Sequence, residues 1–244
     1  MKLVGTSALI VAMALSVASC GGSATDAGQP FVESPLPTIG LGSDTGSGSI
    51  SGGADVRAID VGAIESVVMI GDSITVGSTP LLDEQLRQLG FAEVTISAQT
   101  GKRMDVSFGS NASGSSIARF VAGDQNGSAA ETLWIVALGT NDIGQYSSDD
   151  EIESAIDEVL APIPDNAPLV WINTYFRDRV EGTIAVNEAI ERRLVERGNA
   201  TIGRWSEVAP NDGILRSDGV HPGDDGAKVF AQFVTLTVAD FLQR

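Results

Sequence analysis

The fold is decided by residues 66–74, which read SVVMIGDSI. Four apolar residues, 67–70, follow one another without polar alternation, which is typical of a strand buried on both faces of a parallel sheet. The chain then passes through Gly71 and Asp72 to Ser73. Ligands of open α/β sheets bind at the carboxyl ends of the strands, so the Ser73 hydroxyl is expected to face that crevice. Gly-Asp-Ser is equally natural in a surface turn, so the tripeptide alone is weak evidence for a nucleophile.

Strand-like and helix-like segments alternate through the rest of the chain, as in a parallel sheet with helices on both faces. Further strands are expected at residues 94–98, 132–138 and 169–172, with a weaker candidate at 200–205. Helices are expected at about residues 80–89, 149–160, 184–197 and 224–242, and a loop at 109–116 before a further short helix. These elements predict an α/β domain, a three-layer α/β/α sandwich with a mostly parallel sheet of about five strands.

The third expected strand ends in LGTND, residues 138–142. This segment also follows the carboxyl end of a strand, so Asn141 is expected on the same edge of the sheet as Ser73. Its side-chain amide can donate a hydrogen bond to a ligand there. The alternative is an ordinary turn residue, because Asn and Asp favour turns on their own account.

A segment near the C-terminus, SDGVHP at residues 217–222, contains the only histidine of the chain. A serine nucleophile needs a general base, usually histidine, so a catalytic triad in this chain must use His221. Asp218 lies three residues earlier and can accept the Nδ1 proton of the imidazole, which fixes its tautomer. The alternative is an exposed loop histidine before the last helix. The segment predicts the base and the orienting acid of a triad with Ser73.

These segments, in this order, resemble the SGNH (GDSL-like) hydrolase family. Its blocks are Gly-Asp-Ser at the first strand, a glycine after the second, Gly-x-Asn-Asp after the third and Asp-x-x-His near the end. The resemblance covers about residues 66–242 and implies the flavodoxin-like fold of that family. It implies that Ser73 is the nucleophile, His221 the base and Asp218 its partner. The backbone N–H of Ser73 and the amide of Asn141 would bind the oxyanion.

The glycine of the second block is assigned to Gly101, which follows the second expected strand. The resemblance implies that its backbone N–H is a further oxyanion donor. The surrounding residues, TGKR at 100–103, do not resemble the family further. The alternative is a glycine that a turn with positive φ requires.

A narrower resemblance is to the SGNH domains of membrane acyltransferases that O-acetylate bacterial cell-wall polymers. It rests on WINT at residues 171–174, on Asn187 and on Trp205. This chain departs from those proteins because it has no multi-helix membrane portion, so an acyl donor would come from elsewhere. Trp171 and Trp205 are equally well explained as core aromatics.

The N-terminus has the layout of an export signal. Lys2 precedes an apolar run at residues 8–15, which is too short to span a bilayer, and VASC follows at 17–20. This resembles a bacterial lipobox, so we expect a signal peptide at 1–19 and lipidation of Cys20, the only cysteine. The alternative is an ordinary signal peptide. Residues 20–55, rich in Gly, Ser and Pro, are expected to form a flexible linker, and 56–244 one domain.

Composition argues against two classes of function. The formal net charge is -17, whereas binding to nucleic acid needs a basic face. One histidine and one cysteine leave only carboxylates as metal ligands, so neither a metal nor another cofactor is expected.

We therefore expect an exported serine esterase, anchored to the membrane through Cys20, that removes O-acetyl or other short acyl groups from cell-envelope glycans. The alternatives are an O-acetyltransferase acting on cell-wall polymers and a lipase or thioesterase. An alternative from a different class of protein is an inactive glycan-binding module. This alternative is disfavoured because the chain contains all four residues of the expected site, Ser73, Asn141, Asp218 and His221.

Overall fold

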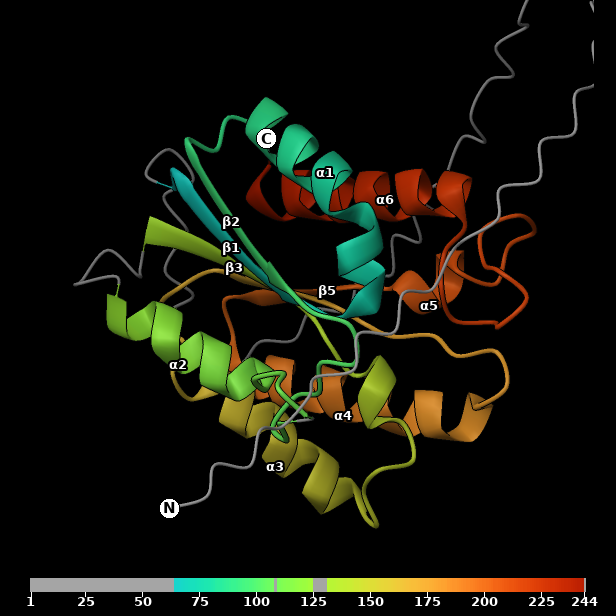
Figure 1. Ribbon diagram of the computed structural model, residues 1–244. Helices are drawn as coiled ribbons and strands as arrows, with labels where there is room; N and C mark the ends of the chain where they lie inside the picture. The colour runs from blue at the N-terminus through green and yellow to red at the C-terminus, as the bar shows by residue number, and fades with distance from the viewer. Residues whose placement is uncertain (1–63, 108, 125–130, 244) are drawn as a thin grey trace, which may run out of the picture. The chain divides into compact units, whose positions relative to one another are not determined.

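The computed structural model describes residues 64–107, 109–124 and 131–243. The expected signal segment 1–19, Cys20 and the linker 20–55 lie outside these residues. Within them, parallel strands form one sheet in the order β2-β1-β3-β4-β5 (Figure 1). The strands are β1 (Ser66–Gly71), β2 (Glu93–Ala98), β3 (Thr132–Ala137), β4 (Leu169–Ile172) and β5 (Ala200–Gly203).

Helices cover both faces of this sheet (Figure 1). One face carries α1 (Ser73–Gln88) and α6 (Asp224–Leu242), which pack against each other. The other carries α2 (Gly114–Asp124), α3 (Asp149–Leu160) and α4 (Val180–Arg197). Two short elements follow β3 and β5, namely the 3-10 helix η3 (Thr140–Asp142) and α5 (Trp205–Val208). The three-layer α/β/α sandwich expected from the sequence is confirmed. None of the helices in the described ranges has the length and apolarity to cross a membrane.

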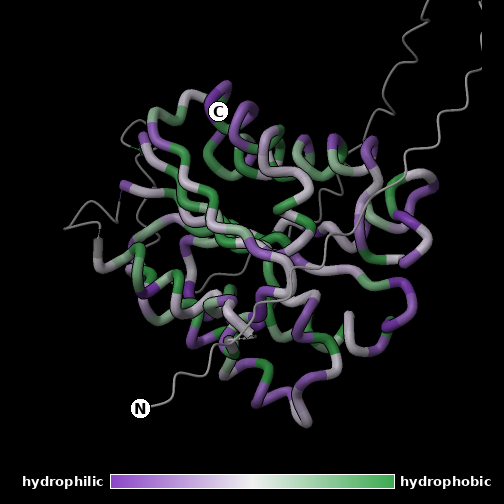
Figure 2. Tube along the Cα trace, viewed as in Figure 1, coloured by the Kyte–Doolittle hydropathy of each residue, from purple (hydrophilic) through white to green (hydrophobic). Residues whose placement is uncertain are grey.

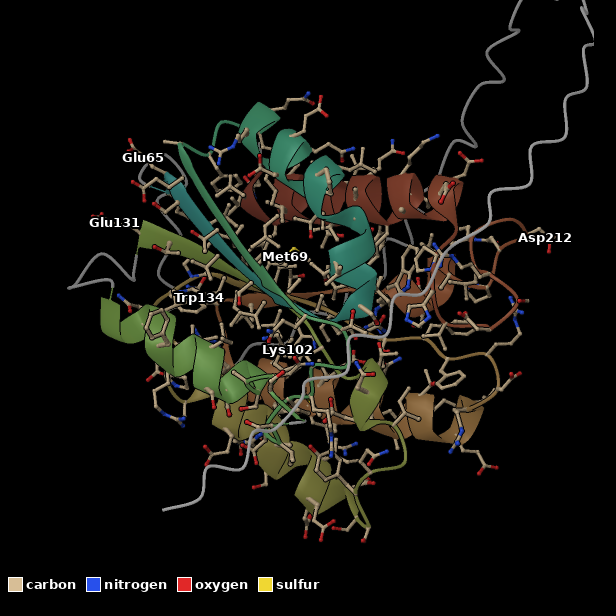
Figure 3. All side chains as sticks on the ribbon, viewed as in Figure 1. Glu65, Met69, Lys102, Glu131, Trp134 and Asp212 are labelled. Atoms are coloured by element: carbon tan, nitrogen blue, oxygen red, sulfur yellow. The ribbon has the colours of Figure 1, made fainter. Side chains whose placement is uncertain are left out.

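The strand β1 lies between β2 and β3 and contributes to both hydrophobic cores. Its side chains alternate, so Val67 and Met69 face the core under α1 and α6, while Val68 and Ile70 face the core under α2, α3 and α4. All four are at most 2% exposed, which explains the uninterrupted apolar run. Figure 2 shows hydrophobic residues gathered along the strands, and Figure 3 shows Met69 and Trp134 within the sheet.

The tryptophans of the narrower resemblance are core residues. Trp171 is fully buried and donates its indole N–H to the Leu138 carbonyl at 3.2 Å. Trp205 is 1% exposed and packs edge-on against Phe230, with ring centroids 5.0 Å apart. Burial of this kind is the usual role of Trp beside a strand, so neither ring is available to a ligand.

Three helices begin earlier than the sequence predicts. α2 begins at Gly114, within the segment 109–116 that was expected to be a loop. α1 begins at Ser73 rather than near residue 80, and Pro80 lies inside it. Proline favours the first turn of a helix, which is why the prediction placed the start there. α4 begins at Val180 rather than 184, and the poor helix propensity of Gly182 conceals its first turn. The last expected strand ends at Gly203, before Trp205, which begins α5.

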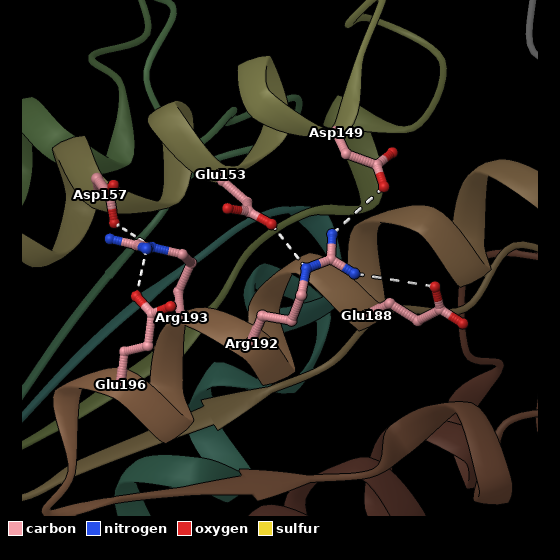
Figure 4. A network of polar contacts seen from close by, with 7 residues as sticks. All are labelled: Asp149, Glu153, Asp157, Glu188, Arg192, Arg193 and Glu196. Atoms are coloured by element: carbon pink, nitrogen blue, oxygen red, sulfur yellow. Dashed lines mark hydrogen bonds and ion pairs between the residues drawn. The ribbon is translucent and has the colours of Figure 1, made fainter.

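Ion pairs join the outer surfaces of α3 and α4 (Figure 4). Arg192 Nε lies 2.6 Å from Glu153, and Arg193 Nε lies 2.7 Å from Asp157. Arg193 also pairs with Glu196 on its own helix. These side chains are largely exposed, so we assign the network a modest role in holding the two helices together.

Candidate active site

Ser73 is the first residue of α1 and directly follows the end of β1. The Asp72 carboxylate accepts the Ile74 N–H at 2.9 Å, which caps the helix and starts it immediately after the strand. Gly71 permits this sharp connection, because any side chain there would overlap that of Thr75. The Ser73 N–H, at the first position of the helix, has no acceptor within the helix and is available to an anion.

The loop of residues 215–222, here called the triad loop, brings Asp218 to His221. Gly219 has a φ of +70°, which glycine adopts without strain, and this turns the chain back between the two residues. A β-bridge between Leu215 and Pro222 closes the loop. Asp218 Oδ2 lies 3.0 Å from His221 Nδ1, and His221 Nε2 lies 2.9 Å from Ser73 Oγ. A carboxylate only accepts, so Nδ1 carries the proton and Nε2 accepts from the Ser73 hydroxyl.

The Asp218 carboxylate is held in its ionised form. Its Oδ1 accepts the backbone N–H groups of His221 and Val220, each at 2.9 Å. These two bonds, the His221 N–H first, lower the pKa of Asp218 to about 2, and its side chain, which is 47% exposed, keeps contact with water. A negative charge beside Nδ1 is able to stabilise an imidazolium at His221.

Asn141 lies in η3, just past the end of β3. Its Nδ2 is 3.1 Å from the Lys102 carbonyl and 3.3 Å from Asp72 Oδ2. The structure therefore brings Asn141 to the residue that precedes Ser73. Both N–H groups of the Asn141 amide face protein acceptors, so donation to an oxyanion requires that one of these hydrogen bonds be given up. The bond to Asp72 is longer and therefore weaker than the bond to Lys102, so it is the one to be exchanged.

Gly101 lies in the turn after β2, which is joined to β1 by a 3.2 Å bond from the Gln99 N–H to the Gly71 carbonyl. Its φ of +74° supports the alternative that the turn itself requires glycine. A glycine required by the turn can also donate a hydrogen bond to a ligand, because the Gly101 N–H has no hydrogen-bond acceptor among the described residues. Lys102, whose carbonyl accepts from Asn141, directly follows Gly101.

Residues 99–104 and 139–142, here called the buried turn pair, are joined by a carboxylate that the sequence analysis overlooked. Asp142 is fully buried and accepts the Met104 N–H at 3.1 Å, the Tyr146 hydroxyl at 3.0 Å and Arg103 Nε at 3.4 Å. Burial raises the pKa of Asp142 to about 6 against the effect of these donors. Asp142 thus fixes the position of the turn that contains Gly101 relative to Asn141.

Asp72 and Lys102 are two further buried ionisable residues to which the sequence motifs assigned no role. Burial raises the pKa of Asp72 to about 6, although the Ile74 N–H acts in the opposite direction. Lys102 is 1% exposed, and its Nζ donates to Gln99 Oε1 and to the Ala112 carbonyl, each at 3.3 Å (Figure 3). Burial lowers the pKa of this amine. The only sequence signal was adjacency, since Asp72 precedes Ser73 and Lys102 follows Gly101.

The chain is similar to known proteins in sequence and in fold. Residues 69–229 match the model of the GDSL-like Lipase/Acylhydrolase family. No curated protein sequence matches the chain significantly. Solved structures share the fold at low identity, and three of them illustrate the range.

The first is the C-terminal catalytic domain of peptidoglycan O-acetyltransferase A from Streptococcus pneumoniae, with 21% identity over 73% of this chain and 94% of that one, at a TM-score of 0.51. The second is Est24, a carbohydrate acetylesterase from Sinorhizobium meliloti, with 13% identity over 72% and 99% and a TM-score of 0.56. The third is the aryl esterase of M. smegmatis, with 13% identity over 72% and 99% and a TM-score of 0.57.

Proposed function

Because this chain belongs to the GDSL-like lipase/acylhydrolase family, as its sequence blocks predict, we propose that it is a serine esterase that uses Ser73, His221 and Asp218. One observation carries the proposal, the unbroken series of contacts from Asp218 Oδ2 through the imidazole to Ser73 Oγ, at 3.0 and 2.9 Å. The same series disfavours an inactive binding module, because such a module has no need of an aligned acid, base and nucleophile.

The reaction follows from this alignment. His221 Nε2 takes the proton of Ser73 as Oγ attacks the ester carbonyl carbon, and a tetrahedral oxyanion forms. The bond from carbon to the alcohol oxygen then breaks, His221 returns the proton to the departing alcohol, and an acyl-enzyme remains. Water attacks this intermediate with His221 again as base. Collapse releases the carboxylic acid and restores the Ser73 hydroxyl.

Three donors are proposed for the oxyanion. They are the Ser73 N–H at the start of α1, the Gly101 N–H and the Asn141 amide. Preorganised donors of this kind act on the charge that develops in the transition state. As the charge forms, the Asn141 amide exchanges its 3.3 Å bond to Asp72 for one to the oxyanion and keeps its bond to Lys102.

The proposed substrate is a cell-envelope glycan that carries O-acetyl or other short acyl groups. Support comes from the structural neighbours, one a carbohydrate acetylesterase and one a peptidoglycan O-acetyltransferase. The second neighbour makes transfer to a sugar hydroxyl the main rival, because hydrolysis and transfer proceed through the same acyl-enzyme. Lipid esters and thioesters are the further rivals.

The test uses residues 20–244 with Cys20→Ser, an activated acetyl ester and an oligosaccharide acceptor. We expect free acetate to be the dominant product and the purified protein to release acetate from O-acetylated cell-wall polymer. Ser73→Ala is the control and should produce neither. Acetylated oligosaccharide as the dominant product would establish the transferase instead.

Export and anchoring are part of the same proposal and rest on the sequence around Cys20 and the linker 20–55. Two or more acyl chains at Cys20 would give stable attachment to the membrane. In a host expressing the whole chain, wild type should fractionate with membranes and Cys20→Ser should not. Wild type that is soluble after export, cleaved at another bond, would contradict the lipid anchor.

A further inference from the structure

A cavity of about 320 Å³, here called the α4–α5 groove, lies beyond the carboxyl ends of β4 and β5. Its lining includes Tyr175, Val180, Ile184, Glu188, Arg204 and Ser206, which come from α4, from α5 and from the loops that follow the two strands. Because all strands are parallel, this groove opens at the same edge of the sheet as Ser73. The strands β1 and β4 are separated by β3 alone, a distance of about 10 Å.

The groove is structurally connected to the triad loop. Arg177, two residues after Tyr175, donates its N–H to the Gly219 carbonyl at 3.0 Å. The Arg177 side chain also packs directly over Gly219, where a Cβ would come within 2.7 Å of it. Asn187 of α4 bonds to both the N–H and the carbonyl of Thr174, at 3.0 and 2.9 Å. The segment that forms one wall of the groove is therefore fixed both to α4 and to the loop that carries His221.

The lining combines apolar surface with free hydroxyl groups. Val180 and Ile184 are 57% and 50% exposed, large values for β-branched apolar side chains. The Tyr175 hydroxyl has no hydrogen-bond partner among the described residues, and the Ser206 oxygen accepts only from Asn173, which leaves its proton to donate. A pyranose presents an apolar C–H face and a rim of hydroxyls, so a wall of this composition complements it.

The charge of the groove selects against anions. Arg204 is its only lining cation, and it pairs with Glu191 at 2.7 Å. Glu188 is largely exposed and forms a long ion pair, 4.0 Å, with Arg192 outside the groove (Figure 4). The charged lining residues Glu188, Glu191 and Arg204 thus carry a formal net charge of −1, which disfavours a carboxylate or phosphate, while carboxylate oxygens accept hydrogen bonds from hydroxyls.

We propose that the α4–α5 groove binds a neutral sugar unit of the same chain whose ester lies at Ser73. The inference rests on the proposed function and deepens it, since it assigns the substrate to neutral oligosaccharides rather than isolated esters. A sugar unit bound in the groove holds the acylated sugar next to it at the triad. A small ester does not reach the groove, so it gains none of the binding energy that the groove provides.

The experiment compares Ile184→Arg, which places a long charged side chain in the groove, with Val195→Arg. Val195 is 77% exposed on the same helix and does not line the groove. The probe is the tetramer of N-acetylglucosamine, titrated calorimetrically, with tetragalacturonate as the anionic counterpart. We expect wild type and Val195→Arg to bind the neutral tetramer equally, and Ile184→Arg to bind it at least tenfold more weakly than wild type. Wild type should bind tetragalacturonate at least tenfold more weakly than it binds the neutral tetramer.

Kinetics provide the second readout. Ile184→Arg should raise the KM for O-acetylated tetramer about tenfold and leave kcat/KM for nitrophenyl acetate within twofold of wild type, which shows that the triad is intact. No binding of the tetramer by wild type, or equal binding by Ile184→Arg, would overturn the subsite. If wild type failed to hydrolyse nitrophenyl acetate, the proposed function would be wrong, while the titration would still decide whether the groove binds sugar.

Discussion

The triad loop and the buried turn pair each hold an aspartate that accepts hydrogen bonds, Asp218 from two backbone N–H groups and Asp142 from one, yet the two carboxylates ionise in different pH ranges. Asp218 is half-exposed and has its pKa lowered to about 2, whereas Asp142 is fully buried and has its pKa raised to about 6. Both receive hydrogen bonds, so the difference comes from desolvation, which opposes the charged form only where water is excluded. The carboxylate that we propose for the triad thus lies in the exposed loop, whereas the buried carboxylate of Asp142 holds two turns together.

The largest expected effect comes from removing the groups that the triad loop and α1 bring together. Ser73→Ala or His221→Ala should lower esterase activity by at least 10³, because no other histidine is present to act as base. Turnover of nitrophenyl acetate and the thermal midpoint should be measured together. A variant with His221→Ala that retained activity within tenfold of wild type would exclude this triad.

The buried turn pair is tested next through Asn141. Its amide strengthens a bond only as negative charge develops, so Asn141→Ala should lower kcat by about 10² to 10³ and change KM little. The substitution also removes the contacts to Lys102 and Asp72, so the thermal midpoint is the necessary control. A raised KM with unchanged kcat would make Asn141 a turn residue or a binder of the ground state.

A smaller effect is expected at Asp72. Asp72→Asn keeps an oxygen for the Ile74 N–H, and Asn caps helices as well as Asp, so stability should change little. The new amide N–H at position 72 would face the N–H of the Asn141 amide. Two donors cannot bond to each other, so the Asn141 side chain would be displaced. We expect kcat to fall about tenfold. Asp72→Ala should in addition cost about 1 kcal/mol of stability through the lost cap. Equal stability of the two variants would contradict the cap.

The smallest effect is the dependence of stability on pH. The pKa of Asp142 in the folded protein, about 6, exceeds the ordinary 3.8, so between these values the folded state binds more protons than the unfolded state. Stability from this group therefore rises as pH falls from 7 to 5, by about 1 kcal/mol. Asp142→Asn should lack this increment in urea titrations at the two pH values. Asp218 acts in the opposite direction, and its contribution is lost only as pH falls from about 4 towards 2.

Much of this fold was predictable from local sequence. The helices at 149–160 and 224–242 were predicted with the bounds that the structure shows, because each is one uninterrupted amphipathic segment. Placement of Ser73 and Asn141 on one edge followed from parallel strands alone, whereas His221 was assigned because it is the only histidine and because the segment resembles the last block of the family. The roles of Asp72, Asp142 and Lys102 were not predictable, because their partners lie up to 69 residues away and their burial is a collective property of the fold.

The distance along the chain between nucleophile and base has a consequence for biogenesis. Ser73 and His221 are 148 residues apart, and α6, which follows the triad loop, packs against α1. Under the proposed mechanism, a nascent or truncated chain that has completed β1, β2 and β3 holds the serine without its base and forms no acyl-enzyme. Turnover should then begin only when the triad loop and the α6 helix that follows it have joined α1, so the onset of turnover during refolding should report completion of the whole domain.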